Sequence, residues 1–589
     1  MDGKALAIAN NDLVYLWWTY PEKIPDCLGF TIHRLEKGKA AAPLPAYVGF
    51  EPKKSDRTPP EHHTTDYWPV QSYQWKDLFV PEEKDVAYEI IPVTGKPGEK
   101  LKELSDLAIR TDGTKATDTL GRYRVIFNQG IVSTQSLSKK LRKWDEGKLS
   151  AEKLRDHISD PKDPIRKQLA GEAPGALVSL LERAKKEGGT CYAALYELTD
   201  KELTDALANS KGHVRIILSN ADSSETGADK KTKKIYDGTN KEAREKLHDV
   251  LGDDIIDRLL PKGNYIGHNK FVVFTDGKGK PKTVLTGSTN WTCTGLCAQS
   301  NNILIIDDET IASQYLDYWH RLADDQGKQG PEFRKANAAP LPRVDMGAGE
   351  GTIQLWFTPD MKQKTKPKGA AAPPPDMDEV FEAIRGAKHG ALFLLFNAGE
   401  PSILDCLEEV SQSRRKEKKE FFVRGAVSDA KTSDKFATRV YNDSLLDAPN
   451  TLITGIGGVP DAFSYWEKEI AKLGYAVIHD KILVLDFRDP ENCTVITGSH
   501  NLGYKASYSN DENYCIIRGN RAIAESYTAH VLDIVNHYNW RYKLNQDKKK
   551  GKSPAGSFTD LDESDNWQNK YFQGNFLKNR DLFFFPGAR

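Results

Sequence analysis

The stretch 265-YIGHNKFVVFTDG-277 places His268 and Lys270 two residues apart at the start of an apolar run that predicts a β-strand. Further along, 476-AVIHDKILVLDF-487 repeats the arrangement with His479 and Lys481. Residues i and i+2 of a strand point to the same face, so each histidine should project beside its lysine. Because the same His-x-Lys arrangement occurs twice, internal duplication is the first hypothesis about the fold.

A Gly-Ser-x-Asn sequence follows each pair after a turn and a second apolar run, in 283-TVLTGSTN-290 and 494-TVITGSHN-501. Each glycine lets the backbone approach a ligand closely. The two predicted hairpins would gather eight polar side chains: His268, Lys270, Ser288, Asn290, His479, Lys481, Ser499 and Asn501.

These side chains suit a phosphate group. Ammonium, hydroxyl and amide groups donate hydrogen bonds to phosphate oxygens, and the ammonium offsets their charge. A neutral imidazole can attack phosphorus, and a protonated one can give a proton to the departing oxygen. One copy supplies one histidine, so two copies would supply both roles at a single phosphorus.

The sequence around the motifs repeats the same order of helices and strands. Alternation of this kind predicts α/β layers with a largely parallel sheet. The first half is expected to contain a helix at 175–189, a strand at 190–198, a helix at 199–212 and a strand at 213–220. The second half is expected to contain a strand at 352–359, a helix at 377–390, a strand at 391–398 and a helix at 402–413.

The first 95 residues follow a different pattern, with short aromatic and β-branched runs between turns rich in proline, glycine and lysine. This pattern resembles a fibronectin type III or immunoglobulin-like domain. We therefore expect a multidomain protein, with an N-terminal antiparallel β-sandwich followed by a duplicated α/β unit whose halves pack around one active site. The expected division is 1–95 β-sandwich, 96–159 connector, 160–325 first α/β module, 326–350 linker, 351–545 second α/β module and 546–589 C-terminal tail.

With these motifs in order, residues 160–545 resemble the phospholipase D superfamily, whose signature is H-x-K-x4-D followed by G-S-x-N. The second motif fits fully with Asp486, whereas the first has Thr275 in the aspartate place and Asp276 one residue later. Members often carry an acidic residue eleven positions after the G-S-x-N asparagine, which orients a histidine. Glu512 holds that position in the second half, and Asn301 holds it in the first.

The resemblance implies a hydrolase that cleaves phosphodiester bonds through a covalent phosphohistidine, with no cofactor and no metal. His268 would be the nucleophile and His479 the general acid. Asp486 and Asn301 would support the site and Glu512 would orient a histidine. The phosphoryl oxygens would be held by Lys270, Lys481, Asn290 and Asn501, with Ser288 and Ser499 in support. Two imidazoles near their ordinary pKa of about 6.5, one neutral and one protonated, would make the pH dependence bell-shaped.

The substrate is left open by the motifs. Nucleic acid is preferred, because the basic clusters 229–234, 413–420 and 547–552 could follow its backbone, although each could equally be a solvated loop. A soluble phospholipase D is the alternative, and an inactive phosphate-binding scaffold or a triggered antibacterial effector are further ones. The N-terminal β domain could bind a protein partner, and the oligomeric state is unknown.

The composition of the chain limits the class of protein to which it can belong. The net charge of −1, with 39% hydrophobic and 28% charged residues, is ordinary for a globular protein. There is no leader-like start and no apolar run of about 18 residues, so we expect a cytoplasmic protein without a transmembrane segment, which could still be exported without a signal peptide. Cys293 and Cys297 read as buried small residues, and His62 and His63 as a solvated loop rather than a metal pair. His500 should point away from the site.

Overall fold

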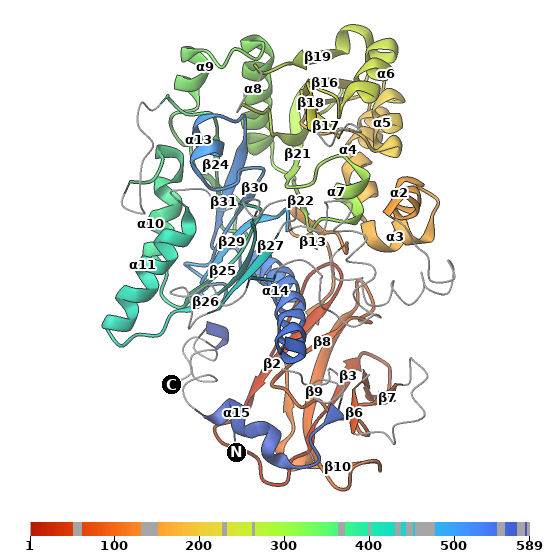
Figure 1. Ribbon diagram of the computed structural model, residues 1–589, viewed down its shortest axis with the longest axis vertical. Coiled ribbons are helices and arrows are strands. Elements are labelled where there is room, and N and C mark those ends of the chain that lie inside the picture. Colours follow the sequence, from red (N-terminus) through yellow and green to blue (C-terminus); the bar gives the residue numbers. More distant parts are fainter. Residues whose placement is uncertain are drawn as a thin grey trace.

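The computed structural model describes residues 2–46, 48–50, 62–130, 151–226, 232–261, 265–362, 372–397, 402–429, 437–442, 452–453, 478–549, 560–573 and 583–585. Two large β-sheets and their helices form the upper part of the molecule, and a group of smaller sheets lies below them (Figure 1). Among the described helices, none is long and apolar enough to cross a membrane.

The first large sheet has eight strands. Three of them run parallel, and the strands of the histidine hairpin and its neighbours run antiparallel. The predicted largely parallel sheet is therefore wrong, because the return of the hairpin reverses the direction of the chain. In spatial order the strands are β13 (Thr119–Leu120), β14 (Tyr123–Phe127), β22 (Asn302–Ile306), β21 (Pro281–Gly287), β20 (Lys270–Thr275), β15 (Thr190–Leu195), β16 (Val214–Ser219) and β19 (Ile255–Arg258).

The second large sheet has nine strands and repeats the central order of the first. The two sheets differ at one outer edge, where β27 runs antiparallel to β26 but β19 runs parallel to β16. In spatial order the strands are β23 (Val344–Asp345), β24 (Thr352–Phe357), β31 (Asn513–Arg518), β30 (Thr494–Gly498), β29 (Lys481–Leu485), β25 (Gly390–Leu395), β26 (Phe422–Asp429), β27 (Ala437–Asn442) and β28 (Leu452–Ile453).

The apolar runs after the two His-x-Lys pairs are buried on both faces, which explains why they read as continuous rather than alternating. Phe271 and Val273 face a core shared by both sheets, while Val272 and Phe274 face the helices of the first half. The first sheet is covered by α4 (Ala173–Glu187), α5 (Lys201–Ala208) and α6 (Lys241–Leu251), and the second by α10 (Asp378–Gly386) and α11 (Ile403–Lys416). Helices α8 (Glu309–Asp325) and α14 (Arg521–Lys549) contribute to the shared core.

The N-terminal part forms antiparallel sheets with their own aromatic core, which includes Trp18, Phe30 and Tyr88. One sheet contains β1 (Lys4–Ala9), β2 (Val14–Thr19) and β8 (Gln74–Asp77), and the other is built on β3 (Gly29–Glu36) and β9 (Asp85–Thr94). Beyond residue 95, β10 (Lys102–Glu103), β11 (Ile109–Arg110) and β12 (Thr114–Lys115) all pair with β9.

The C-terminal segment returns to both cores. Helix α15 (Asn569–Phe572) lies beside the N-terminal sheets, where the preceding Trp567 packs against Phe30 (Figure 1). Phe584 stacks on Trp17 with ring centroids 4.4 Å apart, inside the shared core. These aromatic residues are buried, so they serve packing rather than stacking on a ligand.

Candidate active site

The two His-x-Lys pairs meet where the large sheets approach each other. The backbone N–H of His268 donates to the carbonyl of Asp511 at 2.9 Å, and that of His479 donates to the carbonyl of Ser300 at 3.1 Å. Each histidine is thus anchored to the opposite half of the chain. The imidazole centroids lie 6.2 Å apart, and both side chains are buried.

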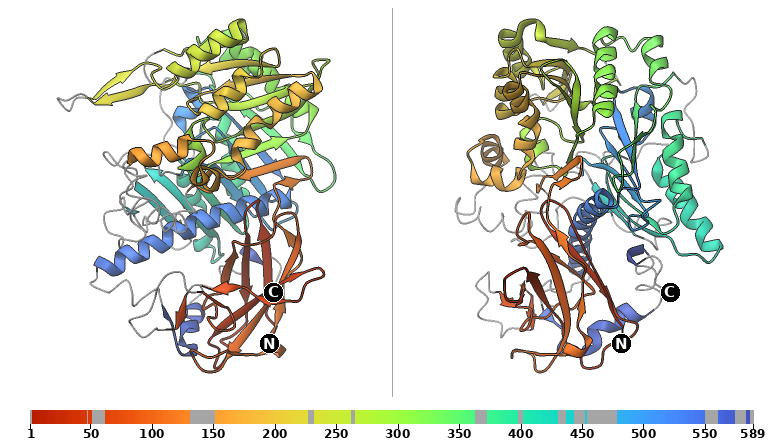
Figure 2. Two further views of the ribbon diagram at one scale, coloured as in Figure 1. Left: turned by 90° about the vertical axis from the view of Figure 1, so that its right-hand side faces the viewer. Right: turned by 180° about the vertical axis from the view of Figure 1, so that it is seen from behind.

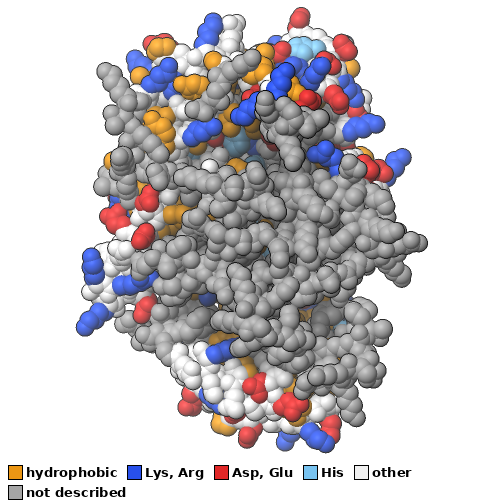
Figure 3. Space-filling view, viewed as in Figure 1, with side chains coloured by type: hydrophobic (Ala, Val, Ile, Leu, Met, Phe, Trp, Pro, Cys, Tyr) orange, Lys and Arg blue, Asp and Glu red, His pale blue; other side chains and the backbone are white. Residues whose placement is uncertain are grey.

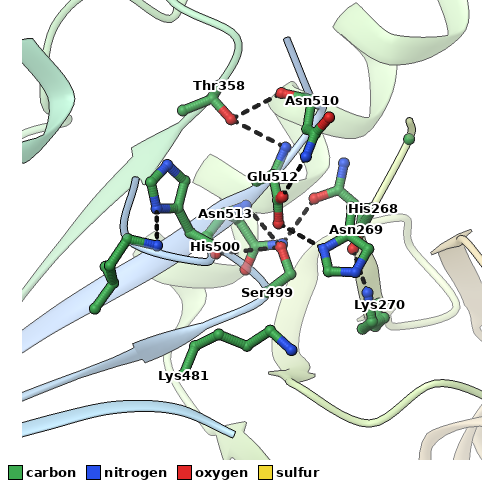
Figure 4. A network of polar contacts seen from close by, with 12 residues as sticks. His268, Asn269, Lys270, Thr358, Lys481, Ser499, His500, Asn510, Glu512 and Asn513 are labelled. Carbon is green, nitrogen blue, oxygen red and sulfur yellow. Dashed lines mark hydrogen bonds and ion pairs between the residues drawn. The ribbon is translucent and has the colours of Figure 1, made fainter. Parts of the chain in front are cut away.

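His268 is oriented by Glu512 of the second half. Its Nδ1 lies 2.8 Å from Glu512 Oε2, and because a carboxylate only accepts, Nδ1 donates and Nε2 is the unprotonated nitrogen (Figure 4). Asn510 Nδ2 donates to Glu512 Oε1 at 2.9 Å, and the Glu512 N–H donates to Thr358 Oγ1 at 3.1 Å. Burial raises the pKa of Glu512, but the charge and hydrogen bond of His268 outweigh it and hold the pKa at about 2.

His479 is oriented by Asn301 of the first half. Its Nδ1 lies 2.8 Å from the amide oxygen of Asn301, which also accepts from Ser288 Oγ at 2.9 Å. Asn301 is fixed in turn through its Nδ2, which donates to the Gly295 carbonyl at 2.9 Å. The acidic residue and its amide counterpart therefore serve the histidine of the other half, an exchange that the spacing along the sequence does not specify.

Both imidazoles are neutral in the free protein. Burial lowers the pKa of His268 to about 4, although Glu512 opposes the shift. Burial, together with Lys481 and Lys270, holds the pKa of His479 well below its ordinary range. The expectation that both histidines titrate from about 6.5 is wrong, because the two halves bury them beside two lysines.

The lysines occupy matching positions. Lys270 Nζ donates to the His268 carbonyl at 2.6 Å, and Lys481 Nζ donates to the His479 carbonyl at 2.5 Å. Each ammonium also lies 5.3 Å from the centroid of an aromatic ring, Tyr196 for Lys270 and Phe396 for Lys481. Burial lowers the pKa of Lys270 to about 7 and that of Lys481 well below its ordinary range.

The serines of the two Gly-Ser-x-Asn turns accept hydrogen bonds from backbone N–H groups. Ser288 Oγ accepts from the N–H of Asn302, and Ser499 Oγ accepts from the N–H of Asn513, both at 3.0 Å. The glycine before Ser288 has φ +140°, and a Cβ there would lie 2.3 Å from a carbonyl oxygen of β22. These groups fix the turns that carry the asparagines.

The asparagines differ in their partners. Asn290 Nδ2 donates to Glu197 Oε2 at 2.6 Å. The amide oxygen of Asn501 has no hydrogen-bond partner within the described ranges. Glu197 and the aromatic rings of Tyr196 and Phe396 were missed in the sequence, although all three directly follow a buried strand, at the end where α/β proteins often place functional groups.

Asp486 lies away from the histidines. It accepts from the backbone N–H groups of Lys388, His389 and Gly390 at 2.7–3.0 Å, which ties the end of β29 to the start of β25. In the first half Thr275 Oγ1 donates to the carbonyl of Thr190 at 3.1 Å and thus links the corresponding strands.

Three further sequence predictions can be located. His500 points away from the lysines (Figure 4), and its Nε2 lies 3.0 Å from Asp376 Oδ2. Cys297 is buried and Cys293 is half-buried, each with a free thiol. His63 lies in the short strand β7 (His63–Thr64) with its ring 4.5 Å from that of Trp68.

Comparison with known proteins gives matches to a family model, to a curated protein and to solved structures. Residues 177–323, which contain the first His-x-Lys and Gly-Ser-x-Asn motifs, match the family model described as cardiolipin synthase, PLD-like domain. A phospholipase D of Rickettsia conorii is 27% identical over 148 residues, which cover 25% of this chain and 62% of that protein. The chain thus spans less than two thirds of this relative.

Two solved structures are among the matches. The phospholipase D family member Nuc from Salmonella typhimurium is 20% identical, with a TM-score of 0.20 over 26% of this chain and 88% of that one. Phosphatidylserine synthase of Haemophilus influenzae Rd KW20 is 11% identical, with a TM-score of 0.37 over 62% of this chain and 85% of that one.

Proposed function

We propose that the chain is a phosphodiesterase of the phospholipase D superfamily with one active site between its two large sheets, which the match of residues 177–323 and the similarity to the Rickettsia phospholipase D support. One observation carries the proposal: the imidazoles of His268 and His479 lie 6.2 Å apart, each with Nδ1 held by an acceptor from the opposite half. This arrangement leaves the two Nε2 atoms for a phosphorus between them. We infer that the two sheets are copies of one α/β unit and that the N-terminal sheets form a β-sandwich.

The reaction begins at His268, which is neutral at physiological pH. Its Nε2 attacks phosphorus, the bond to the leaving oxygen breaks, and that oxygen takes a proton from His479. Water then attacks the phosphohistidine, His479 accepts the water proton, and His268 departs. Protonation of His479 requires the substrate, because the negative charge of a bound phosphodiester offsets the two lysines that keep its pKa low.

The unequal orienting groups support this assignment of roles. Attack places a positive charge on His268, which the Glu512 carboxylate stabilises. His479 has only the neutral amide of Asn301, so its imidazolium stays the stronger acid. The nucleophile His268 is thus oriented by a carboxylate, and the proton donor His479 is oriented by an amide.

We place nucleic acid first among the substrates. The hairpin β17 (Ser223–Thr226) and β18 (Thr232–Ile235) projects from the body of the molecule and carries the exposed Lys233 and Lys234 (Figure 2, left). It begins just after Ser219, whose Oγ accepts from the N–H next to His268 at 3.1 Å. A nucleic-acid strand bound along this hairpin would lead to the two histidines.

The other basic clusters support the proposal less. Cluster 413–420 lies at the C-terminal end of α11, where Arg414 donates to the carbonyl of Ala387 and cations stabilise the helix end. The side chains of cluster 547–552 and residues 229–231 lie outside the described residues. Lys and Arg side chains are mixed with Asp and Glu on the upper part of the face in Figure 3. The name of the Rickettsia relative makes a phospholipid head group the second candidate.

The test uses the full chain in EDTA, assayed in parallel on single-stranded DNA, double-stranded DNA, RNA and mixed phospholipid vesicles. His268→Ala is the site variant, and Glu187→Gln on α4 is the control, because Glu187 pairs with Arg183 on the surface. Cleavage of nucleic acid that is lost only in His268→Ala supports the proposal. Release of head groups with the same dependence replaces the nuclease with a phospholipase, and activity that persists in His268→Ala refutes the site.

A further inference from the structure

Glu197 is a carboxyl group in the site to which the reaction above gives no role. It is the second residue after β15 and is half-buried. Its Oε2 accepts from Asn290 Nδ2 at 2.6 Å, and its carbonyl accepts from the N–H of Trp291 at 3.1 Å. Side chain and backbone are thus both tied to the turn that carries Asn290.

The other half has an amide at the corresponding place. Leu195 pairs with Lys270 as Leu395 pairs with Lys481, so Glu197 corresponds to Asn397. The residue between is aromatic in both halves, with Tyr196 5.1 Å from His268 and Phe396 5.2 Å from His479 between ring centroids. Packing is therefore preserved between the halves, and the carboxyl group is specific to the side of His268.

The charges around Glu197 favour its uncharged form when substrate is bound. The titratable groups around it lie at four strands of both halves: Tyr196 after β15, His268 and Lys270 at β20, His479 and Lys481 at β29, and Glu512 before β31. A phosphoryl oxygen held by Asn290 would lie beside this carboxyl group, and an ionised carboxylate, which only accepts hydrogen bonds, would repel that oxygen. A protonated Glu197 instead offers a hydrogen-bond donor to the same oxygen. Burial also raises the pKa of Glu197, against the opposing effects of Lys270, Asn290 and Lys481.

We propose that Glu197 binds the phosphodiester as an uncharged acid, with Oε2 kept on Asn290 and the protonated oxygen donating to a non-bridging phosphoryl oxygen. This role rests on the proposed function and adds a phosphate-binding residue that the superfamily signature does not contain. Where Glu197 is ionised in the free protein, the proton on its donating oxygen must come from solvent. Binding of a phosphodiester is therefore coupled to the uptake of a proton at Glu197. Glutamine can reproduce both hydrogen bonds of the acid, whereas alanine reproduces neither.

The test measures binding of dimethyl phosphate to the full chain by NMR titration between pH 6 and 9. We expect Glu197→Ala to bind about tenfold or more weakly, the loss of one hydrogen bond to a charged oxygen. Glu197→Gln should weaken binding far less. Binding to Glu197→Gln should also take up one proton fewer than binding to the unmodified protein. The remaining proton uptake, measured as the change of affinity with pH, comes from Lys270, Lys481 and His479. Thermal unfolding of each variant checks folding, and Glu187→Gln is the matched control.

The outcomes separate the two proposals. If the unmodified protein binds dimethyl phosphate and Glu197→Ala binds it equally well, the role of Glu197 is refuted and the proposed function stands. If glutamine is as damaging as alanine, the ionised carboxylate is the required form and the uncharged acid is refuted. If the unmodified protein binds no phosphodiester, the proposed function fails and the role of Glu197 fails with it.

Discussion

Replacing Glu512 with glutamine should remove the charge that stabilises the positive imidazole formed when His268 attacks phosphorus. The substitution keeps size and shape, and the amide oxygen can still accept from His268 Nδ1 at the 2.8 Å position. His268 is neutral before attack and charged after it, so the ion pair exists only along the reaction. An interaction confined to the transition state affects kcat and kcat/KM together.

The structure sets the magnitude. The pKa of Glu512 falls from its ordinary 4.5 to about 2 despite complete burial, chiefly through the charge of His268. Burial opposes this shift, and His500 and Lys270 contribute to it; the hydrogen bond between the carboxylate and a charged imidazole itself contributes about 1.5–3 kcal/mol. If most of it is realised in the transition state, Glu512→Gln lowers kcat/KM by roughly a hundredfold with KM nearly unchanged.

The assay is steady-state hydrolysis of bis(4-nitrophenyl) phosphate at pH 7, with unfolding in urea measured on the same preparations. Glu525→Gln is the matched control, because Glu525 is another glutamate held by ion pairs, half-buried on α14 with Arg521 and Arg488. A loss below about threefold, or one confined to KM, would refute the reasoning, because it would show that no charge develops beside Glu512 in the rate-limiting step.

Three other predictions concern the remaining groups. Asn301→Asp should raise the pKa of His479 and shift the alkaline limb of the kcat profile to higher pH; an unmoved limb contradicts the assignment of the acid. The kcat/KM of the unmodified enzyme should fall as pH drops toward 4, where His268 gains a proton, and fall again above about 7, where Lys270 loses the charge that holds the phosphoryl oxygens; an acid limb near 6.5 would contradict the burial of His268. Gly287→Ala should cost about 2 kcal/mol or more in the free energy of unfolding in urea, because its φ of +140° and the close carbonyl both exclude a Cβ; an unchanged midpoint would show that the turn relaxes freely.

The positions of the His-x-Lys pairs could be predicted because strand geometry alone sets which neighbours share a face. The resemblance to the superfamily, built on the same residues, is confirmed by the match of residues 177–323. The partner of each histidine could not be predicted, because spacing along the chain places Glu512 beside the second pair while packing carries it to His268. The pKa values of the imidazoles were missed for the same reason, since burial between halves is a tertiary property. Glu197 was missed because a glutamate after a strand is common and only its contact with Asn290 distinguishes it.

The exchange of orienting groups explains why both halves are needed for more than the supply of a second histidine. Glu512 directly follows Asp511, whose carbonyl accepts from the N–H of His268, and Asn301 directly follows the residue whose carbonyl accepts from the N–H of His479. Asn513, directly after Glu512, donates to Asn269 at 2.7 Å, so the middle of the first His-x-Lys pair is also held from the other half. Separating the halves would leave each histidine without its acceptor, and a free Nδ1 no longer fixes which nitrogen carries the proton. The orientation of the nucleophile and the acid is therefore a product of the interface, and substitutions there should reduce activity while each half keeps its own helix-covered core.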